Sequence, residues 1–348
     1  MQKKYCEIGS EFWLDDIRED SSSIHVLSGR TAIDFIIQDV KAMGSQAMRV
    51  YMPAWCCDSM LQPFKDRNVD IDFYDLSWKS GVINFEIDIA KEVDILYITN
   101  YFGYSNTMPI ETIIDFKRRG AIIIYDRTHS LFKEDSIVEC LADYTFGSIR
   151  KWISVVSGAY LEKKDGQFNV TALTDCPYIS YRKEAMELKA SYMSGDNSID
   201  KQDFLDKYSR FSHLLEEDYR NYRMDEHSLN LWQYADKKSI KKCRCANAVA
   251  LEVCLQELPN VQFMFKLGEG DCPLFVPILL DNKDERDSLR RYLTSNAIYC
   301  PIHWPKPSLI SKDAMAYRIY DRELSLLCDQ RYGFDDMLKI ANTIKEFY

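Results

Sequence analysis

Short apolar runs alternate with segments of helical spacing along the first half of the chain. A buried strand appears as a brief continuous or alternating apolar run, whereas an amphipathic helix repeats its apolar positions every three to four residues. On this basis we expect strands at 49–53, 69–75, 94–101, 121–126, 143–147 and 158–162, and helices at 28–40, 58–67 and 109–119. Strands that alternate with helices predict an α/β fold with a mostly parallel sheet covered on both faces.

The pattern changes after residue 175. The stretch 175–218 is charged and rich in tyrosine, and we expect it to be helical with a polar break at 194–198. A long helix from about 229 to 258 should lead to strands at 275–280, 298–303 and 324–328, and to a terminal helix from Phe334. These changes predict an N-terminal segment (1–23), a large domain (24–236) and a smaller α/β C-terminal domain (237–348).

Composition narrows the class of protein. The 348 residues are 46% hydrophobic and 28% charged, which suits a globular chain with a sizeable core. A formal charge of −10 without any basic tract argues against nucleic acid or an anionic membrane as a partner. No apolar run reaches the ~18 residues of a membrane span and no signal-peptide core follows Met1, so we expect a cytoplasmic protein. The eleven cysteines include no paired Cys-x-x-Cys, which favours reduced thiols over a zinc site or a disulfide framework.

Asp126 and Lys151 are the most informative pair of candidate residues. Asp126 ends the apolar run Ile122–Tyr125, and Lys151 follows a second strand in the pattern Ser148-x-x-Lys151. Pyridoxal phosphate (PLP) needs an amine that holds its aldehyde as a Schiff base and a carboxylate that keeps its ring nitrogen protonated. Each residue alone is an ordinary charged group at a strand end, but together they predict a PLP site.

Several neighbours fit supporting roles. His129, three residues after Asp126, is placed to reach the phenolic oxygen of the cofactor or to be a structural histidine. Arg150 is a cation beside Lys151, and a nearby cation favours a neutral, nucleophilic lysine. Ser148 has a hydroxyl that suits the cofactor phosphate.

A phosphate-binding turn is predicted at Ser28–Ile33, where a Gly-containing turn enters a helix. Backbone N–H groups and the helix dipole favour an anion at such a position, although an ordinary N-cap by Ser28 gives the same pattern. It is not a dinucleotide fingerprint, because G-x-G-x-x-G is missing. Trp55 is expected either to stack on the cofactor ring or to lie in the core. Asn221, in the cluster Asn221-Tyr-Arg-Met224, could reach a phosphate or begin a solvated helix.

The ordered set of motifs resembles the DegT/DnrJ/EryC1/StrS aminotransferases, which are PLP enzymes of fold type I that often act on nucleotide-linked keto sugars. The resemblance spans about residues 7–345. It is carried by Ser-Gly-Arg-Thr-Ala at 28–32, Pro-Ala-Trp at 53–55, Asn-Tyr-Phe-Gly at 100–103, Asp-x-x-His at 126–129, Ser-x-x-Lys at 148–151, Asn-Tyr-Arg-Met at 221–224 and the segment 298–304.

The resemblance implies a role for each matched residue. Lys151 would hold the cofactor and move protons, Asp126 would bind the pyridine nitrogen, and His129 would lie near the phenolic oxygen. Trp55 would stack on the ring, while Gly29, Arg30, Thr31 and Ser148 would surround the phosphate. The resemblance also implies a seven-stranded type of sheet and a homodimer with shared active sites, in which Asn221 comes from the neighbouring subunit; a two-fold dimer is also the commonest oligomer.

The chain departs from the family pattern at three places. Arg127-Thr128 is bulky where small residues are usual, Gly158-Ala159 replaces a Gly-Gly pair, and Arg30 stands where a smaller residue is common. These changes leave the cofactor chemistry intact, indicate a divergent branch and leave open whether its acceptor is the family's usual sugar.

The leading hypothesis is an aminotransferase that takes an amino group, by the family's default from glutamate, and passes it to a keto substrate, with a nucleotide-linked keto sugar as one acceptor class. The second is a PLP enzyme of another type, a dehydratase or lyase; sugar dehydratases of the family have histidine in place of the lysine, so Lys151 favours transamination. The third is a non-catalytic protein that keeps the fold for binding.

Overall fold

The computed structural model describes residues 22–44, 48–105, 108–134, 136–170 and 172–348, so most of the predicted N-terminal segment lies outside the described residues. An eight-stranded sheet forms its centre, in the order β1-β8-β7-β6-β5-β2-β3-β4. Six strands run in one direction: β1 (Ser22–Val26), β2 (Arg49–Pro53), β3 (Asp70–Lys79), β5 (Ile95–Thr99), β6 (Ile122–Asp126) and β7 (Tyr144–Ser148). Strands β4 (Val82–Glu86) and β8 (Ala159–Lys163) run the other way.

This sheet confirms the predicted α/β fold with a mostly parallel sheet. It has eight strands where a seven-stranded type was expected, because β3 extends to Lys79 and turns back through Ser80-Gly81 to pair with β4. Gly81 has a φ of 86°, which suits glycine in a tight hairpin turn. Neither β1 nor β4 was predicted from the sequence.

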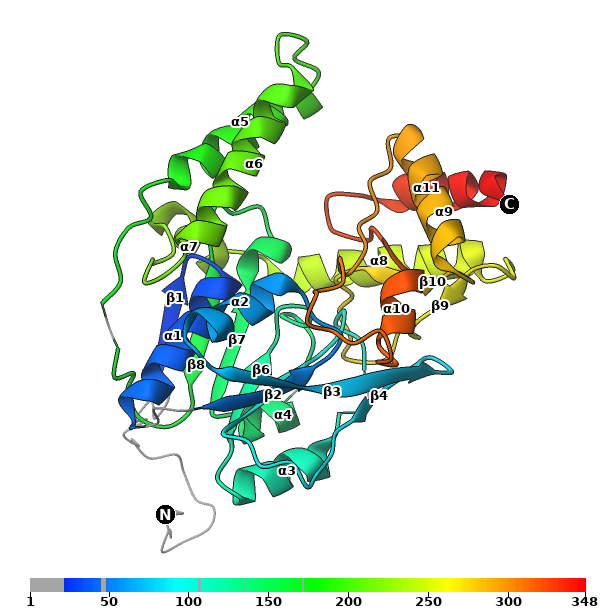
Figure 1. The fold of residues 1–348 in the computed structure, drawn as a ribbon. Helices are drawn as coiled ribbons and strands as arrows, with labels where there is room; N and C mark the ends of the chain where they lie inside the picture. The colour runs from blue at the N-terminus through cyan, green and yellow to red at the C-terminus, as the bar shows by residue number, and fades with distance from the viewer. Residues whose placement is uncertain (1–21, 45–47, 106–107, 135, 171) are drawn as a thin grey trace, which may run out of the picture.

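Helices cover both faces of the sheet (Figure 1). Helices α1 (Gly29–Ala42) and α2 (Asp58–Asp66) lie together on one face, and α3 (Ile110–Arg118) and α4 (Ser136–Leu141) lie on the other. The predicted helices at 28–40, 58–67 and 109–119 are therefore confirmed. The two layers bury the sheet on both sides, as a parallel sheet requires.

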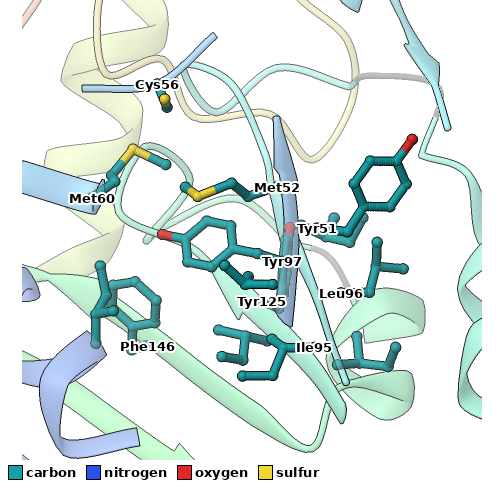
Figure 2. Close-up of a cluster of buried hydrophobic side chains, with 14 of the residues drawn as sticks. Tyr51, Met52, Cys56, Met60, Ile95, Leu96, Tyr97, Tyr125 and Phe146 are labelled. Atoms are coloured by element: carbon teal, nitrogen blue, oxygen red, sulfur yellow. The ribbon is translucent and has the colours of Figure 1, made fainter. Parts of the chain in front are cut away.

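The strands at the centre of the sheet bury side chains on both faces. Every residue of β5 and of β7 is buried. Figure 2 shows side chains of the central strands and of the segment after β2 packed into one cluster, which includes Tyr51, Met52, Cys56, Met60, Ile95, Leu96, Tyr97, Tyr125 and Phe146. Fixed packing of this kind holds the ends of the central strands in place, and those ends carry the candidate site.

Helices α5 (Ile179–Met193) and α6 (Lys201–Glu217) pair side by side and project away from the sheet (Figure 1). Their separation at 194–200 confirms the predicted polar break. The single helix predicted over 229–258 is wrong: α7 (Glu226–Gln233) ends before α8 (Lys237–Leu255) begins. Asp236 explains the break, because its side chain accepts a hydrogen bond from the Ser239 amide and caps the start of α8.

A second, three-stranded sheet follows α8 and packs with helices around its own apolar core. Its order is β11-β10-β9, all antiparallel. The elements of this part are β9 (Gln262–Phe263), β10 (Val276–Leu279), α9 (Lys283–Ser295), α10 (Tyr317–Arg322), β11 (Glu323–Leu326) and α11 (Phe334–Phe347). The separate core fits the small domain that we predicted, although the boundary at 236/237 stays a prediction.

The strand predicted at 298–303 is wrong. That segment is irregular, and it meets β11 through the bond from the Ser325 amide to the Pro301 carbonyl. Pro301 has no N–H to donate to a ladder, and the His303 amide donates instead to the Glu323 carboxylate. Apolar alternation in this segment therefore reflects burial against β11 and not membership of the sheet.

Candidate active site

A cavity opens at the carboxyl ends of the central parallel strands. Strands β5, β6 and β7 end at Thr99, Asp126 and Ser148, and all three residues line it. In open α/β sheets this edge is the usual place for a ligand. The lining also includes Ser28, Gly29, Arg30, Ile33, Cys57, Ser59, Met60, Thr128, His129, Phe146, Arg150, Lys151, Leu215 and Trp304. The structure thus brings together Gly29, Arg30, Asp126, His129, Ser148 and Lys151 from the sequence-predicted set.

Asp126 is a buried carboxylate that faces the cavity. Its Oδ2 accepts a bond of 2.6 Å from the Tyr97 hydroxyl, and its Oδ1 accepts one of 2.7 Å from the Thr128 amide. Burial raises the pKa of Asp126 above its usual value, and these two bonds and the nearby Lys151 charge partly offset that rise. A carboxylate held this way in a dry site is complementary to a cationic ring nitrogen.

Lys151 reaches the same cavity from η1 (Ile149–Lys151), the turn after β7. The side chain of Lys151 stays accessible to solvent through the cavity, and the protein atoms packed around it lower its pKa by desolvation, with a further contribution from the Arg150 charge, although Cys57 and Asp126 oppose this shift. The turn is fixed because the Ile149 amide donates to the Gly158 carbonyl at 3.0 Å. Gly158 has a φ of 138°, a backbone conformation that residues with a side chain rarely adopt, so glycine is favoured there.

His129 lies beside the lysine, with its Nε2 3.3 Å from Lys151 Nζ. Burial and the neighbouring Lys151 and His303 hold the pKa of His129 well below its usual value, so its imidazole is neutral. The Trp304 ring packs against His129 with centroids 5.1 Å apart, and Lys151 Nζ is 6.0 Å from the Trp304 ring. On this side the cavity is therefore lined by the uncharged rings of His129 and Trp304, next to the Lys151 amine.

The opposite end of the cavity is cationic. Ser28 caps α1 by accepting from the Thr31 amide, which confirms the N-cap, while Gly29 and Arg30 line the cavity at the N-terminus of the same helix. A Cβ on Gly29 would point at Ser148 Cβ, 3.6 Å away. The predicted phosphate turn and the N-cap are therefore one structure, and the absence of a side chain at Gly29 leaves space beside the helix end.

Arg30 and Arg150, which line this end, and Arg182, which lies near Arg150 outside the lining, have buried Nε atoms without a hydrogen-bond partner among the described residues. Arg150 and Arg182 both lie against the Phe211 ring, with Cζ atoms 5.9 and 5.6 Å from its centroid. Burial, together with the charges of Arg182 and Arg30, lowers the pKa of Arg150 to about 9. Within the described part of the chain, Arg30 uses only Nη1, which donates to the Leu215 carbonyl at 2.8 Å. Guanidinium groups that keep unfilled donors and raise one another's electrostatic energy are suited to an anion.

Three predicted residues do not line the cavity. Thr31 is buried, and its hydroxyl donates to the Tyr219 carbonyl at 2.8 Å. Trp55 stacks on Tyr101 at 4.5 Å and donates from Nε1 to the His303 carbonyl. Asn221 accepts a bond from Gln38 Nε2 at 2.9 Å, outside the cavity. Their roles toward a cofactor stay predictions.

Other site residues were missed or only partly noticed in the sequence. Tyr97 was missed because it reads as one more apolar residue of β5; its hydroxyl meets Asp126 because β5 and β6 are parallel neighbours. Arg182 lies in a helix where charges usually face solvent, so no local signal marks it. Trp304 belongs to the segment 298–304 noted in the sequence, and the structure places it in the cavity wall next to His129.

Two negative observations apply to the described part of the chain. None of its helices has the length and apolar character needed to cross a membrane. Within the same residues, no group of three or more histidine, cysteine or acidic side chains is arranged to hold a metal ion.

Of the comparisons with known proteins, only the one with solved structures finds similar proteins. No family model matches the sequence, and no curated protein matches it either. Solved structures do match. A DegT DnrJ EryC1 StrS aminotransferase from Brucella abortus is 16% identical, with a TM-score of 0.62 over 93% of this chain and 85% of that chain.

Two further matches are of the same kind. A putative sugar aminotransferase from Streptococcus pneumoniae, solved in a PLP form, is 13% identical, with a TM-score of 0.66 over 93% of this chain and 86% of that one. PseC from Helicobacter pylori, an aminotransferase of pseudoaminic acid biosynthesis, is 13% identical, with a TM-score of 0.64 over 93% and 86%. The chain thus has the fold of PLP enzymes of fold type I along nearly its whole length.

Proposed function

We propose that this protein is a PLP-dependent aminotransferase. The observation that carries the proposal is that one cavity holds Lys151, Asp126 and a cationic end made by Arg30 and Arg150. These are the three kinds of group that PLP needs, for its aldehyde, its ring nitrogen and its phosphate. The fold shared with sugar aminotransferases solved with PLP and with its amine form supports the same conclusion.

The residues present fit the cofactor. Asp126 is a buried carboxylate that accepts hydrogen bonds from its neighbours, and no cation among the residues that the structure describes forms an ion pair with it. Within the same residues, the Nε atoms of Arg30 and Arg150 are without a hydrogen-bond partner. When bound, PLP would supply an electron-withdrawing ring that stabilises negative charge on the substrate carbon. Lys151 would hold its aldehyde, Asp126 its ring nitrogen, and Ser148, Arg30, Arg150 and the start of α1 its phosphate.

Each of the protein's own groups at the site has a separate role. Lys151, whose pKa is lowered, is the base that accepts and returns a proton at the substrate carbon. The Asp126 carboxylate would stabilise the positive charge on the ring nitrogen throughout the reaction. His129, a neutral imidazole 3.3 Å from Lys151 Nζ, orients that amine. Trp304 closes the cavity beside it and excludes water.

The direct test is a single turnover with an amino donor. Purified protein loaded with PLP and mixed with glutamate should lose its visible absorbance and release 2-oxoglutarate, because transamination leaves the amine form of the cofactor. A keto acid added afterwards should restore the band. Loss of the band with release of ammonia or of a dehydrated product would instead support a lyase or dehydratase. A protein that stays colourless with PLP would support a non-catalytic role.

The phosphate end offers an independent prediction. Arg150→Met should weaken PLP binding by roughly 10- to 100-fold, since a charge-assisted bond to phosphate is lost. Binding of pyridoxal, which lacks the phosphate, should change little. Fluorescence titration with both compounds measures this difference. The matched control is Arg119→Met, which removes a surface arginine paired with Asp115. Equal weakening for PLP and pyridoxal would contradict the assignment.

The proposal extends to acceptor, assembly and location. Similarity in fold to sugar aminotransferases supports a keto sugar as the acceptor.

The position of Asn221 outside the cavity of its own chain supports a homodimer in which it serves the neighbouring site, which sedimentation and subunit mixing would test. The cysteines in the described part of the chain are free thiols, which supports a cytoplasmic location that cell fractionation would check.

A further inference from the structure

A series of hydrogen-bonded side chains runs from beside the cavity residues His129 and Trp304 into the smaller sheet, and the proposed function does not use it. It begins at His303, whose ring stands perpendicular to the His129 ring at an angle of 89°, with centroids 5.3 Å apart. His303 Nδ1 lies 2.8 Å from Ser325 Oγ, and the Ser325 hydroxyl donates to Glu323 Oε1. The other carboxylate oxygen, Oε2, accepts from the His303 amide at 2.6 Å.

The three hydrogen-bonded residues, His303, Ser325 and Glu323, are all buried. Glu323 and Ser325 occupy alternate positions of β11, so their side chains leave the same face of the strand. Strand β11 therefore delivers a carboxylate and a hydroxyl side by side to the loop that carries His303. The His303 carbonyl is fixed as well, because it accepts from Trp55 Nε1 at 2.7 Å.

The bonds determine which ring nitrogen of His303 carries the proton. The Ser325 hydroxyl has one hydrogen and gives it to Glu323, so its oxygen accepts from the His303 ring. His303 Nδ1 must therefore be the N–H, and Nε2 of the neutral ring has a free lone pair. The tautomer is set by a buried carboxylate acting through a hydroxyl, as in sites where a base is held by an orienting group.

The negative charge of Glu323 affects the protonation of His303. The Glu323 carboxylate is buried, and the one ion pair found for it in the described part of the chain is with His303, 3.9 Å away. Arg286 donates to the backbone carbonyl of Glu323 and pairs with Asp287. A buried carboxylate is costly without a cation, and His303 becomes that cation when it takes a second proton.

The other groups around His303 act in the opposite sense or carry no charge. Burial, with a smaller contribution from the Lys151 charge, lowers the pKa of His303 below its usual value, and Glu323 offsets only part of that shift. The remaining ring neighbours are aromatic: Phe102, Phe275 and Trp304. His303 therefore stands between one negative group behind it and two basic groups, His129 and Lys151, in front.

We propose that His303 is a positioning residue of the active site. Ser325 and Glu323 fix its ring with Nδ1–H directed to Ser325 and Nε2 unprotonated, so that His303 packs in one orientation against His129, which in turn lies beside Lys151. The proposal rests on the proposed function in that Lys151 is the reacting amine. When His303 takes a second proton at Nε2, it keeps its Nδ1–H bond to Ser325, with Glu323 behind it.

The tautomer can be tested without any cofactor. The chain has five histidines, so ring-nitrogen NMR spectra of labelled protein are simple, and loss of a signal in His303→Asn assigns His303. We expect a protonated Nδ1 and an unprotonated Nε2 in the wild type. In Glu323→Gln the proton affinity of His303 should fall by roughly tenfold, because a facing negative charge is lost. A protonated Nε2 in the wild type, or unchanged affinity in the variant, would overturn the proposal.

The effect on the site is read from the PLP-loaded enzyme. The pH midpoint of its visible absorbance should move to lower pH in Glu323→Gln and in Ser325→Ala, by roughly a tenfold change in proton affinity. Ser325→Thr keeps the hydroxyl and should restore the midpoint. The control Phe275→Leu alters packing on the His303 ring without a hydrogen bond, so it should change thermal stability but not the midpoint.

Failure of the proposed function can be distinguished from failure of the positioning role of His303. If wild-type protein forms no visible band with PLP, the proposed function fails, and the cofactor-free NMR experiment still decides whether Glu323 and Ser325 fix His303. If the band forms and its midpoint is the same in the wild type, Glu323→Gln and Ser325→Ala, the proposed function stands and the positioning role is wrong.

Discussion

Lys151→Ala should abolish the visible absorbance of bound PLP and reduce amino transfer by at least about 10³-fold. The amine both holds the cofactor and moves the proton, and loss of a positioned acid–base group alone costs about 10²- to 10⁴-fold. The protein should remain folded, because Lys151 is directed into a solvent-accessible cavity and is not part of the packed core. Absorbance spectra and a donor–acceptor assay measure the two effects.

Two controls make this result specific. Lys151→Arg keeps a cation at the same place but has no amine that can hold the aldehyde, so it should also lack the band. Lys183→Ala removes an exposed lysine of α5 and should behave as the wild type. Borohydride reduction followed by peptide mapping should find the cofactor on Lys151. Cofactor fixed to another lysine would contradict the assignment of the whole site.

Asp126→Asn should reduce amino transfer by about 10²- to 10³-fold, the usual loss when one preorganised electrostatic contact is removed from an active site. The amide cannot balance a positive charge on the ring nitrogen, so the ring withdraws electrons less well. Its volume and its acceptor oxygen are retained, so the Tyr97 hydroxyl still has a partner. Steady-state kinetics with the wild type and the variant test the expectation.

The same substitution should stabilise the cofactor-free protein at neutral pH. Burial raises the folded-state pKa of Asp126, so stability is present at low pH and is lost as pH rises through that pKa. Asparagine removes this penalty, and thermal unfolding without PLP should occur at a higher temperature than in the wild type. Added PLP should then stabilise the wild type more than the variant. A less stable cofactor-free variant would show that the carboxylate has a structural partner instead.

The local pattern of the sequence was sufficient for most of the large sheet. Strands β2, β5, β6, β7 and β8 and helices α1, α2 and α3 appear where apolar spacing and turn residues predict them. The failures have physical causes. Pro301 prevents the apolar segment 298–303 from joining a ladder, and the Asp236 cap divides an otherwise continuous helical pattern. Strands β1 and β4 pair antiparallel with distant or hairpin partners, a choice that tertiary contacts make.

The candidate site was predictable where chemistry follows a strand end. Asp126, His129, Ser148 and Lys151 come from two neighbouring parallel strands, and parallel strands bring their carboxyl ends to one edge. Trp55 shows the limit of this reasoning. It follows β2 at the same edge, yet its ring stacks on Tyr101 while Trp304, from a remote loop, lines the cavity. Spacing along a strand does not determine which way a ring turns in a packed core.

The sequence by itself determined the kind of protein: an α/β chain with an amine, a carboxylate and an anion-binding turn at the ends of its strands. These features are local, since each depends on residues a few positions apart. The tertiary structure alone decided that Arg182 of α5 and Arg150 lie against the same Phe211 ring, that the hydroxyl of Tyr97 meets Asp126, and that Glu323 and Ser325 of β11 hold His303 beside His129. Such contacts join residues tens to hundreds of positions apart, and only the packing of the complete chain brings them together.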